Sequence, residues 1–186
     1  MKEYAMTKRI ILAVSGSISA YKSADLTSKL KKKGYDIHVI MTESAQSFIT
    51  PLTLQALSKN PVHSDVMEEK LAERINHIDL AKKTDLFIVA PASANTIAKL
   101  AHGMADNMLT ATALALPSTT PKLIAPAMNT KMYENPLTKK NLDTLHDLGY
   151  QEILPKSGLL ACGDTGRGAL ADISVIIESI DNALTK

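Results

Sequence analysis

Short apolar segments rich in β-branched residues alternate along this chain with longer segments of helical periodicity. Strands buried on both faces form continuous apolar runs, because helices cover both sides of a parallel sheet. We therefore predict an α/β fold: a doubly wound, Rossmann-like or flavodoxin-like parallel sheet with helices on both faces. The predicted strands are Arg9–Val14, Asp36–Met41, Asp85–Ala90, Lys122–Ala125 and Glu152–Leu154.

Apolar residues at helical spacing mark the segments between these strands. In the first such segment the apolar residues share a face that we expect to point into the core, and Gly34 follows as a stop signal. These residues are Ile18, Tyr21, Leu26 and Leu30. In the segment Thr138–Leu148, we expect Leu142, Leu145 and Leu148 to face inward. The predicted helices are Ile18–Lys33, Thr138–Leu148 and Asp172–Leu184.

Length and composition favour a single domain over residues 1–186, with residues 1–7 as a flexible tail. The chain has 186 residues, of which 45% are hydrophobic and 22% charged. Its net charge of +2 is too small to indicate a nucleic-acid surface, and no apolar run is long enough to span a bilayer. One cysteine excludes an intrachain disulfide and fits a reducing compartment. We expect a soluble, cytoplasmic protein.

Polar and small residues follow the predicted strands, where parallel sheets bind their ligands. Gly16 lets backbone approach a ligand closely, and free amides at a helix start favour an anion. Helix capping and ligand contact both explain the hydroxyl and amide side chains, so both interpretations stay open. The segments are Ser15–Ser17, Thr42–Ser44, Ser93–Thr96, Asp106–Asn107 and Ala127–Asn129.

His77 is a candidate base at the start of a short predicted helix. An imidazolium is disfavoured near a helix N-terminus, so a neutral imidazole is available there. A surface or capping histidine is the alternative. No two histidines have metal-ligand spacing and one cysteine cannot form a thiolate cluster, so we predict no metal site.

The segment from Gly158 to Leu170 contains four of the eight glycines and the only cysteine, Cys162. A cysteine among glycines and polar residues does not suit a core. We predict that residues 156–170 form a mobile loop that closes over a substrate.

These motifs together resemble the homo-oligomeric flavin-containing cysteine decarboxylases, from Arg9 to about Ile180. The resemblance implies FMN as cofactor and assembly into trimers, or dodecamers built from trimers. It implies no nucleic-acid or membrane partner. The segments that carry it are Pro91–Thr96, Pro126–Tyr133 and Ala161–Gly168, with His77 upstream.

The same resemblance implies roles for individual residues. His77 would be the essential base, and Cys162 would donate a proton. Substrate contacts are implied for Asn129, Met132, Ala161, Gly163 and Asp164. FMN contacts are implied for Gly16, Ser17, Ile18, Thr42, Ser44, Ser93, Ala94, Asn95, Thr96, Asp106, Ala127 and Met128.

The implied reaction is decarboxylation of 4′-phospho-N-pantothenoyl-L-cysteine to 4′-phosphopantetheine in coenzyme A biosynthesis. FMN would oxidise the cysteinyl thiol, carbon dioxide would leave, and the resulting enethiolate would be protonated and reduced. The alternatives are a peptidyl-cysteine decarboxylase, a flavin prenyltransferase and a regulatory or inhibitory flavoprotein subunit.

Three departures from the family pattern bear on these expectations. The chain ends at Lys186 without the ligase domain of bifunctional relatives, so we expect it only to decarboxylate. Ala169 stands where many relatives have arginine, and Arg167 is a candidate replacement. Met108 for a common leucine conserves volume and is expected to have little effect.

Overall fold

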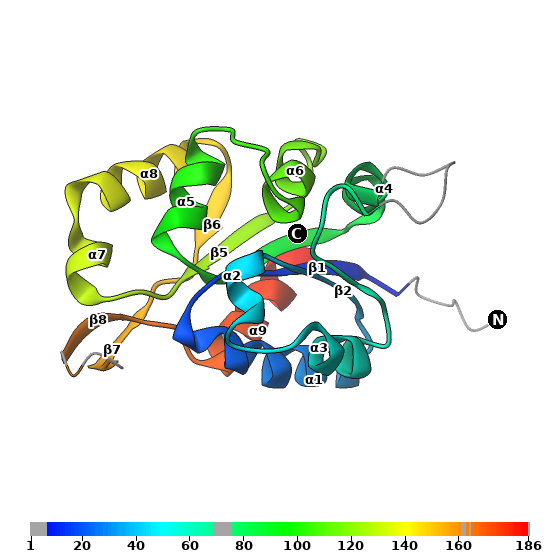
Figure 1. Cartoon of the computed structure of the whole chain (residues 1–186), viewed down its shortest axis with the longest axis horizontal. Coiled ribbons are helices and arrows are strands. Elements are labelled where there is room, and N and C mark those ends of the chain that lie inside the picture. The colour runs from blue at the N-terminus through cyan, green and yellow to red at the C-terminus, as the bar shows by residue number, and fades with distance from the viewer. Residues whose placement is uncertain (1–6, 69–75, 161–162, 164, 186) are drawn as a thin grey trace.

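The main sheet has six parallel strands in the order β3–β2–β1–β4–β5–β6 (Figure 1). The structure, a computed structural model, describes residues 7–68, 76–160, 163 and 165–185. The predicted doubly wound parallel sheet is confirmed. The short edge strand β3 was not predicted, because two residues carry no pattern. The strands are β1 (Arg9–Val14), β2 (Asp36–Met41), β3 (Val62–His63), β4 (Leu86–Ala92), β5 (Lys122–Pro126) and β6 (Tyr150–Glu152).

Helices cover both faces of this sheet (Figure 1). One face carries α1 (Ser23–Lys32), α3 (Pro51–Ser58) and α9 (Ile173–Leu184). The other carries α4 (Asn76–Lys83), α5 (Ala94–Ala101), α6 (Met108–Leu114) and α8 (Pro136–Asp147). Two short helices, α2 (Glu43–Gln46) and α7 (Thr130–Glu134), follow the ends of β2 and β5. In the described part of the chain no helix is long and apolar enough to span a membrane.

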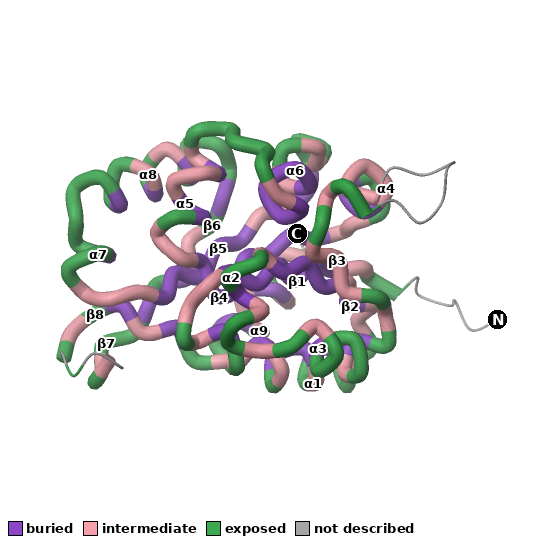
Figure 2. The backbone as a smooth tube through the Cα atoms, viewed as in Figure 1, coloured by how far each residue is buried: buried purple, intermediate pink, exposed green. Residues whose placement is uncertain are grey.

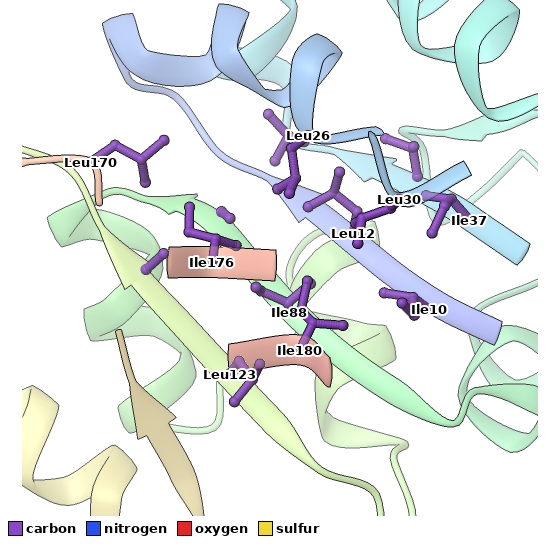
Figure 3. Packing of buried hydrophobic residues seen from close by; sticks show 14 of the residues in the cluster. Ile10, Leu12, Leu26, Leu30, Ile37, Ile88, Leu123, Leu170, Ile176 and Ile180 are labelled. Carbon is purple, nitrogen blue, oxygen red and sulfur yellow. The ribbon is translucent and has the colours of Figure 1, made fainter. Parts of the chain in front are cut away.

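The core consists of two layers, one on each side of the sheet. Figure 2 shows that buried residues concentrate along the central strands, and Figure 3 shows side chains of the first layer. Successive side chains of β1 alternate between them, so Ile10 and Leu12 enter one layer while Ile11 and Ala13 enter the other. All four are fully buried. Burial of each large aliphatic side chain contributes about 1.5–3 kcal/mol relative to exposure. The strands that carry the site are therefore its most firmly held parts.

The end of β4 departs from regular alternation. The strand continues to Ala92, past the predicted end at Ala90, and its register with β5 shifts between Val89 and Ala92. Pro91 in this interval has no N–H to donate to the ladder. Ala90 belongs to the first core layer and Ala92 to the second. The irregular end sets the direction in which the chain leaves the sheet at Ser93.

The predicted helix Ile18–Lys33 is two elements, a 3₁₀ helix η1 (Ile18–Lys22) followed by α1. The predicted burial of its first turn is wrong, since Ile18 and Tyr21 are 56% and 58% exposed. Ala20 of the same turn is fully buried in the first core layer, so the turn directs this one side chain inward and leaves Ile18 and Tyr21 outside. Leu148 is also exposed, because α8 ends at Asp147 and the chain turns there toward β6.

A two-stranded antiparallel sheet follows β6. It consists of β7 (Lys156–Leu159) and β8 (Thr165–Ala169), so most of the described part of the predicted loop 156–170 is a hairpin. Ala161, Cys162 and Asp164 lie outside the described residues. At the root of the hairpin, the N–H of Met128 donates to the carbonyl of Gly168 at 2.9 Å. This bond joins β8 to the segment that follows β5.

Candidate active site

The site lies where the chain reverses its winding direction, between the carboxyl ends of neighbouring strands β1 and β4. Open α/β sheets bind ligands at this position. Buried Ser15 joins the two strand ends: its hydroxyl donates to the carbonyl of Pro91 at 2.8 Å and accepts from the N–H of Ser93 at 2.8 Å. The sequence placed Ser15 in a strand-end segment open to helix capping or ligand contact, but it did not predict that the hydroxyl joins two strand ends. It is a positioning residue.

Two adjoining hollows open at this point. The first, here called the apolar hollow, has a volume of about 440 Å³ and is lined by residues after β1, β4 and β5 and by the β7–β8 hairpin. The second, the polar hollow, has about 400 Å³ and is lined by residues after β2 and β4 and before α6. Residues common to both linings are Gly16, Ser93, Ala94 and Met132.

Helix starts surround the polar hollow. The Ser93 hydroxyl accepts from the N–H of Thr96 at 3.2 Å and caps α5, and Thr42 caps α2 in the same way. Asn107 and Thr110 form a reciprocal capping box at the start of α6. The capping interpretation is thus confirmed for these residues. Each cap uses only part of a helix's free amides, and the remaining first-turn amides favour an anion.

One ion pair lines the polar hollow. Lys99 of α5 bonds to Asp106, and this hydrogen bond lowers the pKa of the Asp106 carboxyl. Glu43 is the other acidic residue of the lining and is exposed. The pairing of Asp106 limits the repulsion that an anion would meet beside it.

The apolar hollow offers a different surface. Ala127 and Met128 come from the end of β5, Ile18 from η1 and Met132 from α7. Asn129 also lines it and caps α7, its side-chain oxygen accepting from the N–H of Lys131 at 2.8 Å. Aliphatic and thioether side chains with few polar groups suit a flat aromatic ring.

Two glycines permit the close approach of backbone segments around these hollows. A Cβ on Gly16 would lie 2.5 Å from the Cβ of Ser44, and a Cβ on Gly168 would lie 2.3 Å from the carbonyl oxygen of Met128. Neither distance is sterically possible, so a side chain at either position would force the segments apart. The glycines therefore fix the width of the site.

The structure brings most of the predicted site residues together. Asn129 and Met132 line the apolar hollow. Gly163 is outside both linings, and Ala161, Cys162 and Asp164 are not described. All predicted cofactor residues line one or both hollows: Gly16, Ser17, Ile18, Thr42, Ser44, Ser93, Ala94, Asn95, Thr96, Asp106, Ala127 and Met128.

His77 lies away from both hollows. It belongs to α4, which packs against α6, and it is absent from either lining. Its Nδ1 is buried and has no hydrogen-bond partner among the described residues. The chain therefore does not bring its own candidate base to Asn129.

Arg167 is outside the apolar hollow as well. It is exposed on β8, and its charge acts on Tyr133, whereas Ala169 lines the hollow. The hollow therefore has a neutral side chain at position 169, and Arg167 adds no charge to its described lining. Leu159 and Leu160, from the segment predicted to close over a substrate, also line the hollow. Lys22 lines it too but was not predicted, because nothing in its spacing marks it. Within the described ranges, no group of three His, Cys, Asp or Glu side chains is close enough to hold a metal ion.

Comparison with known proteins agrees with this architecture. The flavoprotein family profile matches residues 2–185. A probable phosphopantothenoylcysteine decarboxylase of Streptococcus mutans is 63% identical over 179 residues, 96% of this chain and 100% of the relative. The coenzyme A biosynthesis bifunctional protein CoaBC of Bacillus subtilis is 50% identical over 171 residues, 92% of this chain. The chain spans only 42% of that bifunctional relative.

Solved structures give the same result. A PPC decarboxylase variant in complex with pantothenoylaminoethenethiol has a TM-score of 0.86 at 34% identity, covering 97% of this chain and 100% of the other. The FMN-dependent cysteine decarboxylase SpaF has a TM-score of 0.83 at 31% identity, covering 96% and 95%. The resemblance inferred from the motifs is confirmed. This chain belongs to the flavoprotein family, and within it is similar over its whole length to phosphopantothenoylcysteine decarboxylases.

Proposed function

We propose that this protein catalyses the FMN-dependent decarboxylation of 4′-phospho-N-pantothenoyl-L-cysteine to 4′-phosphopantetheine in coenzyme A biosynthesis. The observation that carries the proposal is the apolar hollow that adjoins capped helix starts at the switch point of the sheet. Its weight comes from 63% identity to the full length of a relative with that name. A cytoplasmic location is part of the proposal.

The shape and chemistry of the two hollows fit FMN. The apolar hollow would take the ring system, and the start of α5, with Ser93, Asn95 and Thr96, would take the phosphate. When bound, the flavin supplies a two-electron sink for the substrate thiol and returns the electrons after carbon dioxide has left.

The chain's own residues would orient the substrate and move protons. Asn129 has an amide that can hold a carboxylate or amide group of the substrate in the apolar hollow. His77 would accept the thiol proton, since a neutral imidazole is a base near neutral pH. Cys162 would then protonate the carbon that has lost carbon dioxide.

A homo-oligomer is part of this proposal, because His77 lies outside the hollows of its own chain. A second copy that presents its own His77 beside Asn129 would complete the site. Apolar side chains are exposed around the apolar hollow, with Ile18 56%, Met132 49% and Leu159 76% exposed. Such a patch is typical of a surface that another chain covers. We propose a trimer, with dodecamers as a further stage of assembly.

The decisive experiment offers the purified protein its proposed substrate. We expect yellow protein, or protein that FMN makes yellow, and stoichiometric release of carbon dioxide and 4′-phosphopantetheine. A protein that binds no flavin would refute the proposal. Turnover confined to peptides ending in cysteine would favour the peptide-modifying activity instead.

A substitution at Cys162 separates the two halves of the reaction. Cys162→Ser should still release carbon dioxide but accumulate the oxidised enethiol, because the carbon is no longer protonated. Mass spectrometry distinguishes this product from 4′-phosphopantetheine by two mass units, the hydrogens of the missing reduction. Full conversion to 4′-phosphopantetheine by the variant would remove Cys162 from the mechanism.

A further inference from the structure

The apolar hollow has a single charged residue in its described lining, Lys22. This lysine ends η1, directly after the turn that carries Gly16, and its side chain is partly buried. Every other described residue of that lining is apolar or neutral. A single ammonium in an otherwise uncharged lining favours one orientation of a ligand that has one anionic end, with that end at the lysine.

Lys22 also lines a third hollow of about 290 Å³, here called the outer hollow. The two hollows share Tyr21 and Lys22, so Lys22 stands at their junction. A ligand longer than the apolar hollow would pass this lysine on its way outward. The outer hollow is lined by Tyr21, Lys22, Asp25, Ala171, Asp172 and Ile173.

Both carboxylates of the outer hollow already have partners. Asp25 pairs with Lys29 at 2.7 Å, and Asp172 pairs with Lys156, a contact that lowers the pKa of Asp172. Lys22 forms no ion pair with the residues that the structure describes. Its charge acts on Asp172 only at longer range. Because Asp25 and Asp172 pair with other lysines, the Lys22 ammonium is available to bind an anionic ligand.

We propose that Lys22 binds the phosphate of the substrate and makes the enzyme select phosphorylated over unphosphorylated cysteine conjugates. The inference rests on the proposed function, in which the cysteinyl end lies at Asn129 and the phosphate at the opposite end of the molecule. A dianion gains nothing from the aliphatic lining of the apolar hollow, because its desolvation there has no compensation. A lysine ammonium is a compact partner for phosphate and is attached through a flexible stem.

Neighbouring cations do not offer the same contact. Arg167 lies outside the apolar hollow, and Ala169 lines it without a charge. Lys156 is absent from the linings of the apolar and outer hollows and is bonded to Asp172. Lys22 thus accounts for phosphate recognition in a chain that lacks the loop arginine of many relatives.

The test compares two substrates in each variant, 4′-phosphopantothenoylcysteine and the unphosphorylated pantothenoylcysteine. Lys22→Gln should raise KM for the phosphorylated substrate about 10- to 100-fold, the loss of one charge-assisted hydrogen bond. It should leave KM for the unphosphorylated substrate within about twofold. Lys22→Arg, which keeps the charge, should preserve most of the preference. The control Lys32→Gln removes an exposed cation from the same part of the chain and should change neither value.

The unphosphorylated substrate reports on folding and chemistry within the same variant. Equal KM changes for both substrates, or no change for either, would overturn the role of Lys22. Loss of both activities in Lys22→Gln would overturn it too, because the residue would then act on more than the phosphate. Failure of the wild-type protein to turn over either substrate would refute the proposed function, which is a separate outcome.

Discussion

The two ends of the same sheet use polar groups in different ways. At the carboxyl end, neutral hydroxyls and amides cap helices and join strand ends, as Ser15 does between β1 and β4, and one ion pair, Lys99 with Asp106, lies beside them. At the amino end, charged side chains pair with one another: Lys8 with Asp85 at 3.0 Å and Arg9 with Asp36 at 3.0 Å. At the carboxyl end, hydrogen-bond donors are left for a ligand. At the amino end, the charged side chains stabilise the fold by pairing with one another.

The volumes of the hollows alone do not show which end of the sheet carries the site. The amino end has a hollow of about 780 Å³, larger than either hollow of the site. Its lining mixes cations such as Lys8 and Arg9 with Asp36 and Asp85, which neutralise them. Surface pairs of this kind contribute about 0.2–1 kcal/mol each. Unsatisfied donors beside an apolar wall identify a ligand site better than size does.

The largest expected effect concerns His77, which lines neither hollow of the site. His77→Asn should lower kcat/KM at least about 1,000-fold, because the thiol loses its base. Flavin absorbance and thermal stability should stay near wild-type values, since the residue lines neither hollow. The matched control is His146→Asn, whose side chain is 83% exposed, and it should keep full activity. Mixing His77→Asn with a Cys162→Ser or Asn129→Asp variant tests whether active sites combine residues of two copies.

The next effect tests the packing of the carboxyl end. Gly16→Ala would place a Cβ 2.5 Å from that of Ser44, so the turn after β1 or the start of α2 must move. We expect a loss of about 1–3 kcal/mol in the free energy of unfolding and at least tenfold weaker FMN binding. Flavin retention after dialysis and denaturant titration measure the two effects. Gly158→Ala has no atom within 4 Å of its new Cβ and should behave as wild type.

The sequence predicted the sheet and the place of the site, but it did not predict every residue that lines the site. The strand-end rule located Gly16, Ser93 and Ala127, because a buried parallel strand has a continuous apolar pattern that ends abruptly. It could not assign Lys22 to the site. A lysine near a helix start has no local signature. Its place at the junction of two hollows depends on residues distant in the sequence, such as Leu159 of the hairpin and Ala171 before α9, rather than on its sequence neighbours.

Burial was the least predictable property. The helical periodicity predicted that Ile18 and Tyr21 of η1 lie in the core, but both side chains are exposed. The same signal was right for Leu26 and Leu30, which follow in α1 and are buried. Periodicity shows which residues share a face of a helix, but not how far the sheet beneath that face extends. The exposed residues of this face, Ile18 and Tyr21, line the apolar hollow.

The substitution Ser15→Ala should lower the stability by a similar amount, through lost hydrogen bonds rather than a steric clash. The variant loses a donor to the carbonyl of Pro91 and the acceptor of the Ser93 N–H, both buried at 2.8 Å. We expect about 1–3 kcal/mol lower stability together with weaker FMN binding, because the start of α5 is no longer held against β1. Ser179→Ala, an exposed hydroxyl on α9, is the control. Lower stability with unchanged FMN affinity would mean that Ser15 does not position the site.

At the amino end, acid should act on stability alone. Burial by itself would raise the pKa of Asp36, but hydrogen bonds from Asn60, Arg9 and His38 outweigh it and lower the pKa to about 2. The unfolded carboxyl has a pKa of about 3.9, so the folded state favours the ionised form. This stabilisation is complete above about pH 5 and is lost as the pH falls toward 2. Burial lowers the pKa of His38, so its protonation below about pH 6.5 also opposes folding.

Asp36→Asn isolates this contribution, because an amide does not titrate. The variant should be about 1–2 kcal/mol less stable than wild type at pH 7, after allowance for solvent screening, and the difference should shrink between about pH 5 and 2. Urea unfolding at several pH values measures it. FMN affinity at pH 7 should not change, since Asp36 lies at the end of β2 opposite the site. A stability difference independent of pH would show that packing of the side chain, rather than its charge, holds the amino end together.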